Sequence, residues 1–160
     1  MPDAPAPVPL SAWHLAQVNI ARALAPLDSP VMAGFVARIA EINALAESSP
    51  GYVWRFQDDT GNALYVRPYD DPNMLFNLSV WQTPDHLKAY VYRSAHVELM
   101  RQKQQWFEHS AEAIMALWWV PAGTLPSVDE AKARLEYLRQ HGPSAHAFGF
   151  REIFPPVGRP

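Results

Sequence analysis

Hydrophobic and polar residues alternate along four stretches of the chain, and this two-residue period is typical of half-buried strands. The predicted strands cover residues 14–21, 52–57, 74–81 and 113–120. A shorter apolar run over residues 64–69 predicts a hairpin arm beside the second strand. Near the C-terminus, Phe148 and Phe150 flank a glycine and predict one more short edge strand.

Apolar residues recur at helical spacing in three other stretches, each opened by a residue that can cap a helix. The caps are Ser29, Thr83 and Ser127; the first two precede a proline, and the third stands three residues before Glu130. The predicted helices cover residues 29–47, 83–110 with an interruption near Ser94, and 127–141. In the resumed part, from His96 to Ser110, the residues predicted to face inward are Leu99, Met100, Lys103, Trp106 and Phe107. Gly142 and Pro143 end the last helix.

The order strand, helix, strand, strand, helix, strand is that of the ferredoxin-like plan. The chain is therefore predicted to be an α+β protein, ferredoxin-like βαββαβ with an extra C-terminal helix. Prolines and the lack of any period predict an N-terminal arm over residues 1–12 and a tail over residues 154–160. Residues 13–153 are expected to form a single domain between them.

In this plan two helices cover one face of the sheet. The polarity of the residues on each face predicts which face that is. Ala16, Val18 and Ile20 are wholly apolar and are expected to face the helices, as are Phe76, Leu78 and Val80. The opposite face would hold Leu15, Gln17, Asn19, Leu75, Asn77, Ser79, Trp81 and either Trp118 or Trp119. A face of this mixed kind is too apolar to leave in water. We therefore expect two copies to pair through it as a dimeric α/β barrel, with a cavity between the sheets.

The amino-acid composition and the absence of certain motifs exclude several classes of function. The charge of the 160 residues is −3, with Lys and Arg scattered, so no nucleic-acid-binding surface is expected. Cysteine is absent, which excludes disulfides, thiolate ligands and cysteine nucleophiles. The N-terminus lacks the pattern of a signal peptide and no apolar stretch is long enough to cross a bilayer, so a cytoplasmic protein with no membrane partner is expected. No phosphate loop, zinc-hydrolase or serine-hydrolase motif occurs.

Four segments carry a resemblance to a known family: residues 14–22, 79–81, 92–96 and 117–123. Together they resemble the domain-of-unknown-function 3291 family over nearly the whole chain. That family is similar to the antibiotic biosynthesis monooxygenases and other dimeric α/β barrels, which include cofactor-free oxygenases and haem-degrading enzymes. The resemblance implies the ferredoxin-like fold and a homodimer, and leaves the reaction open.

The haem-degrading subgroup has an asparagine on the first strand, and a tryptophan and a histidine on the helix after the third. Asn19 matches the asparagine, Tyr90 stands where the tryptophan would be, and His96 lies about one helical turn too early. These departures argue against haem degradation of that kind. No cofactor is predicted, although haem with His96 as its proximal ligand is kept as a variant of the hypothesis, with no other metal site.

The leading hypothesis is an enzyme that acts on a flat, hydrophobic or aromatic small molecule by a monooxygenase-like or isomerising reaction. His96 and Asn19 are the candidate catalytic residues, as proton carrier and as hydrogen-bond donor to a substrate oxygen. The candidate substrate-binding residues are Gln17, Arg55, Asn77, Ser79, Trp81, Tyr90 and Trp118. Each has a structural alternative, such as an amide satisfied across the sheet or an aromatic ring that fills the core. A non-catalytic metabolite-binding or sensor module and a purely structural dimer remain as alternatives.

Overall fold

The computed structural model describes residues 12–93, 97–98 and 101–160, and the N-terminal arm predicted over residues 1–12 lies almost wholly outside them. The strands are β1 (Trp13–Arg22), β2 (Tyr52–Arg55), β3 (Met74–Trp81) and β4 (Met115–Pro121). The helices are α1 (Ala33–Glu47), α2 (Pro84–Val91) and α4 (Val128–His141), with short 3-10 turns η2 (Pro30–Met32) and η3 (Lys103–Gln105).

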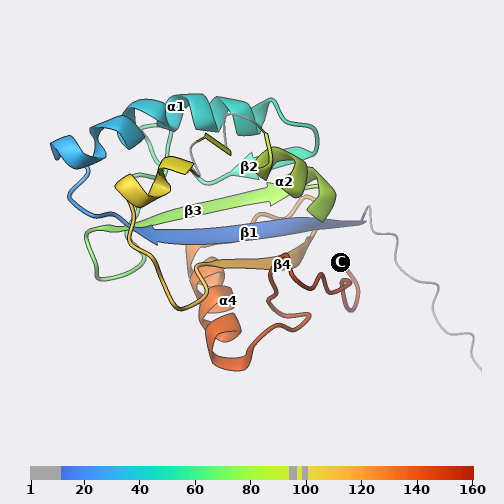
Figure 1. Cartoon of the computed structure of the whole chain (residues 1–160). Helices are drawn as coiled ribbons and strands as arrows, with labels where there is room; N and C mark the ends of the chain where they lie inside the picture. Colours follow the sequence, from blue (N-terminus) through green and yellow to red (C-terminus); the bar gives the residue numbers. More distant parts are fainter. Residues whose placement is uncertain (1–11, 94–96, 99–100) are drawn as a thin grey trace, which may run out of the picture.

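The four strands form one antiparallel sheet in the order β2-β3-β1-β4. This order, with α1 between β1 and β2 and α2 between β3 and β4, is the ferredoxin-like arrangement that the sequence predicts. Figure 1 shows α1 and α2 on one side of the sheet and α4 on the other. The sheet is therefore the middle layer of three, and the extra C-terminal helix is confirmed.

Two of the three predicted caps form as expected. The Thr83 hydroxyl accepts a hydrogen bond from the His86 amide at 3.2 Å, and the Ser127 hydroxyl accepts one from the Glu130 amide at 3.0 Å. Ser29 behaves differently, because its hydroxyl donates to the carbonyl of Pro26 at 2.6 Å. The chain there makes the 3-10 turn η2 before α1 begins.

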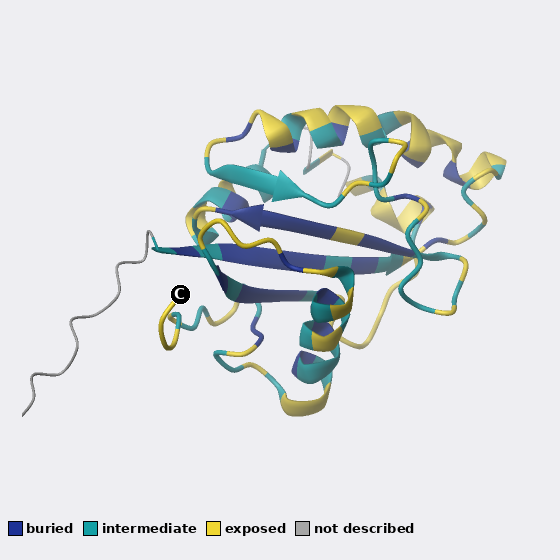
Figure 2. Ribbon diagram, turned by 180° about the vertical axis from the view of Figure 1, so that it is seen from behind, coloured by how far each residue is buried: buried dark blue, intermediate teal, exposed yellow. Residues whose placement is uncertain are grey.

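The wholly apolar face of the sheet is buried beneath α4. Its central residues have 0 to 4% of their surface exposed: Ala16, Val18, Ile20, Phe76, Leu78, Val80, Ala116, Trp118 and Val120. Ala131, Leu135 and Leu138 of α4 pack on them. Figure 2 shows β1, β3 and β4 mainly in the colour of buried residues and β2 as intermediate. The apolar face of the sheet is thus removed from water within a single chain, which is the favourable part of this packing.

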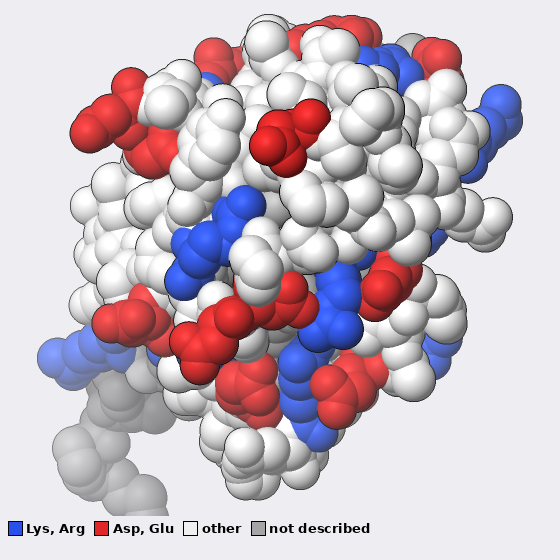
Figure 3. All heavy atoms as spheres, turned by 90° about the vertical axis from the view of Figure 1, so that its left-hand side faces the viewer, with Lys and Arg blue, Asp and Glu red and all other residues white. Residues whose placement is uncertain are grey.

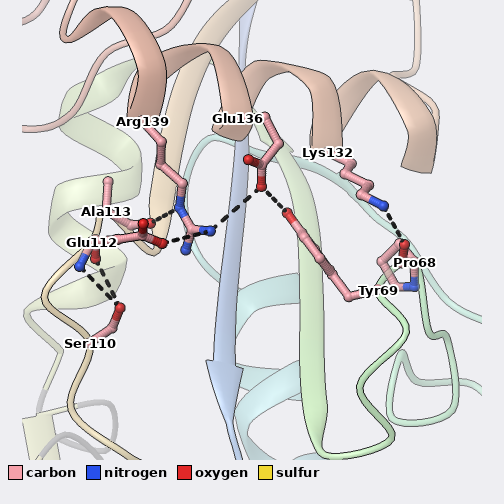
Figure 4. A network of polar contacts seen from close by, with 8 residues as sticks. All are labelled: Pro68, Tyr69, Ser110, Glu112, Ala113, Lys132, Glu136 and Arg139. Carbon is pink, nitrogen blue, oxygen red and sulfur yellow. Dashed lines mark hydrogen bonds and ion pairs between the residues drawn. The ribbon is translucent and has the colours of Figure 1, made fainter.

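The loop between β2 and β3 completes the cover on this side. Val66 and Tyr69 pack against the same core, and the loop is tied to α4 by polar contacts (Figure 4). Lys132 donates to the carbonyl of Pro68 at 2.9 Å, and the Tyr69 hydroxyl lies 3.3 Å from a Glu136 carboxylate oxygen. α4 and the loop therefore act as one layer.

These contacts correct the prediction about the two faces. The wholly apolar set was expected beneath α1 and α2, but it lies beneath α4 and the 56–73 loop, and the mixed face lies beneath α1 and α2. The physical reason is that one helix and a loop with apolar side chains give enough cover to bury an apolar sheet face. The face-to-face pairing that was expected to enclose the mixed face loses its basis, and association of two copies stays a prediction.

Several element boundaries also differ from the prediction. β2 ends at Arg55, and the run over residues 64–69 is a loop rather than a hairpin arm. The 3-10 turn η3 begins at Lys103, where a continuous helix was predicted. Lys103 is exposed, although it was predicted to face inward, and Trp106 and Phe107 follow η3. Leu99 and Met100 lie outside the described residues. The predicted edge strand is reduced to two isolated bridges, Leu117 with Phe148 and Gly149 with Glu152.

Charged groups of both signs are interleaved on the face seen in Figure 3, with no patch of one sign. Among the described residues, no helix is long and apolar enough to pass through a membrane.

Candidate functional site

The register of the sheet brings five polar side chains together on the face beneath α1 and α2. In one row across three strands, Arg55 of β2 pairs with Ser79 of β3, which pairs with Gln17 of β1. In the next row, Asn77 pairs with Asn19. Paired residues of an antiparallel sheet point to the same side, so these five form one polar patch. We call Gln17, Asn19, Arg55, Asn77 and Ser79 the polar patch.

The deeper part of the polar patch is a closed hydrogen-bonded chain. The Trp81 indole N–H donates to the Ser79 hydroxyl at 3.0 Å, and that hydroxyl donates to the Gln17 side-chain oxygen at 2.8 Å. The exposed fractions of Gln17 and Ser79 are 8% and 7%. These two residues therefore form a bonded floor that ties β1 to β3, in which the Ser79 hydroxyl and the Gln17 side-chain oxygen are paired.

The two asparagines differ from this floor. Asn19 is half-buried and Asn77 is exposed, although both lie on strands in the interior of the sheet. Neither side-chain amide has a hydrogen-bond partner in the part of the chain that the structure describes. Each amide offers two donors and an acceptor. The Asn19 and Asn77 row is thus the part of the polar patch that solvent reaches.

Arg55 supplies the charge of the polar patch. Its Nε lies 2.8 Å from a Glu47 carboxylate oxygen at the end of α1, and its side chain is only 11% exposed. No hydrogen bond from its two terminal nitrogens to a described residue is found. A guanidinium held through Nε can still present these nitrogens as a planar pair of donors.

Aromatic rings border the polar patch toward α2. The Tyr90 ring stacks on the Trp81 indole with centroids 5.0 Å apart, and the Tyr52 ring meets the same indole edge-on at 5.7 Å. Trp81 is consequently 1% exposed, while Tyr90 is half-buried. Burial raises the pKa of Tyr90 to about 12 and also raises the pKa of Tyr52. Both phenols are therefore protonated at neutral pH.

Most of the predicted site residues are brought together, and two are not. Gln17, Asn19, Arg55, Asn77, Ser79, Trp81 and Tyr90 share one side of the sheet. Trp118 lies on the other side, fully buried beneath α4, because it pairs with Ala16 of the apolar set. Its neighbour Trp119 faces the mixed side and donates its N–H to the Phe154 carbonyl at 2.8 Å. His96 lies outside the described residues.

Sequence reasoning missed two contributors to this site. Tyr52 was assigned only to a strand, and Glu47 only to the end of a helix. The alternation in residues 52–57 suggested a regular strand, but a register shift between Tyr52 and Trp54 puts Tyr52 and Arg55 on the same side. Nothing in a single sequence marks such a bulge.

Haem or a metal finds no ligand in the polar patch. Amides, a hydroxyl and a guanidinium are not the axial ligands that haem iron takes in proteins. Among the described residues, no group of three or more His, Cys, Asp or Glu could hold a metal ion. The polar patch therefore supplies no haem ligand, and His96, the ligand that the haem variant needs, lies outside the described residues.

The fold and the polar patch define this chain as a ferredoxin-like α+β protein with its candidate site between the sheet and the α1/α2 layer. The model of one family, domain of unknown function DUF3291, matches residues 14–160. The chain therefore belongs to the DUF3291 family. A search of curated proteins found no significant match.

Solved structures with a similar course of the chain were also found. SnoaB, a cofactor-independent oxygenase from Streptomyces nogalater, is 18% identical, with a TM-score of 0.49 over 71% of this chain and 98% of that one. NE2512, a protein of unknown function from Nitrosomonas europaea, is 17% identical, with a TM-score of 0.47 over 73% and 98%. The ferredoxin-like fold follows from the strand order of this chain, not from these similarities.

Proposed function

We propose that this protein binds a flat, largely apolar molecule with an oxygen substituent at the polar patch and acts on it in a monooxygenase-like or isomerising reaction. The observation that carries the proposal is the pair of amides on Asn19 and Asn77, side by side, open to solvent and without partners among the described residues. Unpaired amides on the same sheet face as a stacked aromatic pair are the composition of a site for such a molecule.

The roles divide between the open and the closed parts of the site. Asn19 and Asn77 donate hydrogen bonds to the oxygen of the ligand, and these bonds strengthen if the oxygen gains negative charge during the reaction. Tyr90 gives the ring a flat apolar surface. Gln17, Ser79 and Trp81 fix the positions of the strands beneath.

A matched pair of probes tests the binding step. Isothermal titration with 1-naphthol and with 1-methylnaphthalene compares two flat molecules that differ in the oxygen. We expect 1-naphthol to bind more tightly, and Asn77→Ala to weaken it about fivefold, the worth of one hydrogen bond of ~1 kcal/mol, with 1-methylnaphthalene unaffected. Equal affinity of the two probes for the wild-type protein would overturn the role of the amides.

The reaction is tested by oxygen uptake in the presence of 1-naphthol and other flat phenols. A monooxygenase-like reaction predicts uptake that requires the phenol and falls in Asn19→Ala. His96, as the predicted proton carrier, is tested by His96→Ala, which should lower turnover and leave the affinity for the phenol unchanged. Loss of affinity without a change in turnover would contradict that role.

A non-catalytic binding or sensor module is the second candidate, and one observation favours it. The polar patch consists of amides, a hydroxyl and a guanidinium, and it contains no carboxylate or imidazole to act as an acid or base. The described residues are therefore sufficient for a protein that binds a ligand without converting it. Saturable binding of 1-naphthol with no oxygen uptake or isomerisation would select this function.

The predicted haem variant has its own experiment. Addition of haem should give a Soret shift that His96→Ala abolishes if His96 is the ligand. A shift that survives this substitution, or no shift, would exclude that assignment.

A further inference from the structure

A cavity of about 430 Å³ lies away from the polar patch, where the end of β4, the start of α4 and the C-terminal residues meet. The C-terminus lies beside the end of β4 and the start of β1 (Figures 1 and 2). Apolar walls come from Trp13, Trp119, Val120, Pro121 and Val157. We call this cavity the C-terminal pocket. Its volume is in the range that small-molecule sites occupy.

The charged lining of the C-terminal pocket has an excess of positive charge. Arg134 and Arg159 line it together with one acid, Glu130. Glu130 is ion-paired with Arg134, with 3.2 Å between the oxygen and the nitrogen. Arg159 is exposed and has no ion pair with a described residue. One uncompensated guanidinium therefore borders the cavity.

Arg134 is held in place before any ligand binds. One terminal nitrogen lies 3.0 Å from His146 Nδ1 and 2.8 Å from the His146 carbonyl, and the other bonds Glu130. Because a guanidinium can only donate, His146 Nδ1 must accept, and the proton of the neutral ring is on Nε2. Burial, followed by the charge of Arg134, lowers the pKa of His146, so the ring is neutral at pH 7. His146 therefore adds a neutral donor beside the guanidinium groups.

We propose that the C-terminal pocket binds a flat organic carboxylate. The two indoles and the aliphatic side chains cover the apolar part of the ligand, and Arg159 and Arg134 bind the carboxylate. Arginine suits this group because its planar donors match the two oxygens. The site is separate from the polar patch and does not depend on the function proposed for it.

The experiment compares 2-naphthoate with its neutral analogue 2-naphthamide by isothermal titration. We expect saturable binding of 2-naphthoate with a Kd of about 1 mM or tighter, as a ligand of this size allows. The amide should bind at least about tenfold more weakly, and Arg159→Gln should weaken the carboxylate by a similar factor. Arg101→Gln is the matched control, because it removes one charge at an exposed position that does not line the C-terminal pocket.

The same titration separates the two sites. Asn77→Ala should leave 2-naphthoate binding unchanged; if that substitution weakens it as much as Arg159→Gln is expected to, the carboxylate is at the polar patch and the proposal is wrong. Equal affinities for the acid and the amide, equal effects of Arg159→Gln and Arg101→Gln, or no saturable binding would each overturn it. Arg134→Gln removes the other guanidinium of the pocket, and it should weaken 2-naphthoate binding by the same factor as Arg159→Gln.

Discussion

Asn19 and Asn77 are direct partners on the adjacent strands β1 and β3, and both side-chain amides point to the side of the sheet that α1 and α2 cover. One row further along, Gln17 and Ser79 are also partners, but they are buried and bonded to each other. The polar patch thus consists of a closed row and an open row. The difference between the two rows leads to opposite expectations for substitutions in them.

Substitution in the open row should cost little stability. Asn77→Ala removes an exposed amide that has no hydrogen bond to a described residue, so the free energy of unfolding should change by less than about 0.5 kcal/mol. Its thermal unfolding curve should overlay that of the wild-type protein, while 1-naphthol binding weakens. A large loss of stability would show that the amide is part of the packing.

Substitution in the closed row should cost much more. Ser79→Ala leaves the buried Trp81 N–H and the Gln17 oxygen without partners, which costs about 1–3 kcal/mol. The melting temperature of a chain of this size should fall by roughly 2–4 °C for each kcal/mol. Ser110→Ala is the matched control, because that hydroxyl is exposed and bonds only within its own turn. Equal melting temperatures of the two variants would contradict the closed row.

Gly51 is the sharpest steric constraint near the site. Its φ is +81°, and a Cβ there would lie 2.1 Å from Cγ of His86. Gly51→Ala should therefore destabilise the protein more than Gly61→Ala, where φ is +87° and nothing lies within 4 Å. Chemical denaturation of both variants measures the difference. His86→Gly removes both the ring and the Cβ that would lie 2.4 Å away, so Gly51→Ala should cost less in that background than in the wild-type protein. An equal cost in both backgrounds would mean that the clash is not its cause.

The phenol of Tyr90 predicts a fall in stability at high pH. Burial raises its pKa from 10.0 to about 12, so between these values the unfolded chain loses the proton while the folded protein keeps it. The contribution of Tyr90 is complete below pH 10 and is lost as pH rises toward 12. Tyr90→Phe should make the pH dependence of unfolding less steep in this window. Tyr69→Phe should act in the same direction, since the pKa of Tyr69 is also raised to about 12, by burial first and then by Glu136. An unchanged slope in both variants would contradict the burial of these rings.

The sequence predicts the elements of this fold more accurately than their packing. Met74–Trp81 is the predicted third strand residue for residue, and Ser127 caps α4 as expected. The alternation in β1 and β3 is enough to place Gln17, Asn19, Asn77 and Ser79 on one side of the sheet. These features depend on local spacing, which a single sequence contains.

The assignment of helices to faces could not be obtained in this way. It depends on where α4 and the 56–73 loop pack after the sheet has formed, and the apolar residues Val66 and Tyr69 had suggested a hairpin arm instead. Trp118 illustrates the consequence: either of two adjacent tryptophans could have faced the site, and only the pairing with Ala16 decides between them. The side of the sheet on which Tyr52 lies could not be predicted either, because it depends on the register shift between Tyr52 and Trp54.

The most direct test of the central claim is diffraction from crystals soaked in 1-naphthol. The account predicts electron density for the ring against Tyr90, with its oxygen at hydrogen-bond distance from the side-chain amides of Asn19 and Asn77. Density for the probe elsewhere, with both amides bound to other residues of the chain, would contradict it.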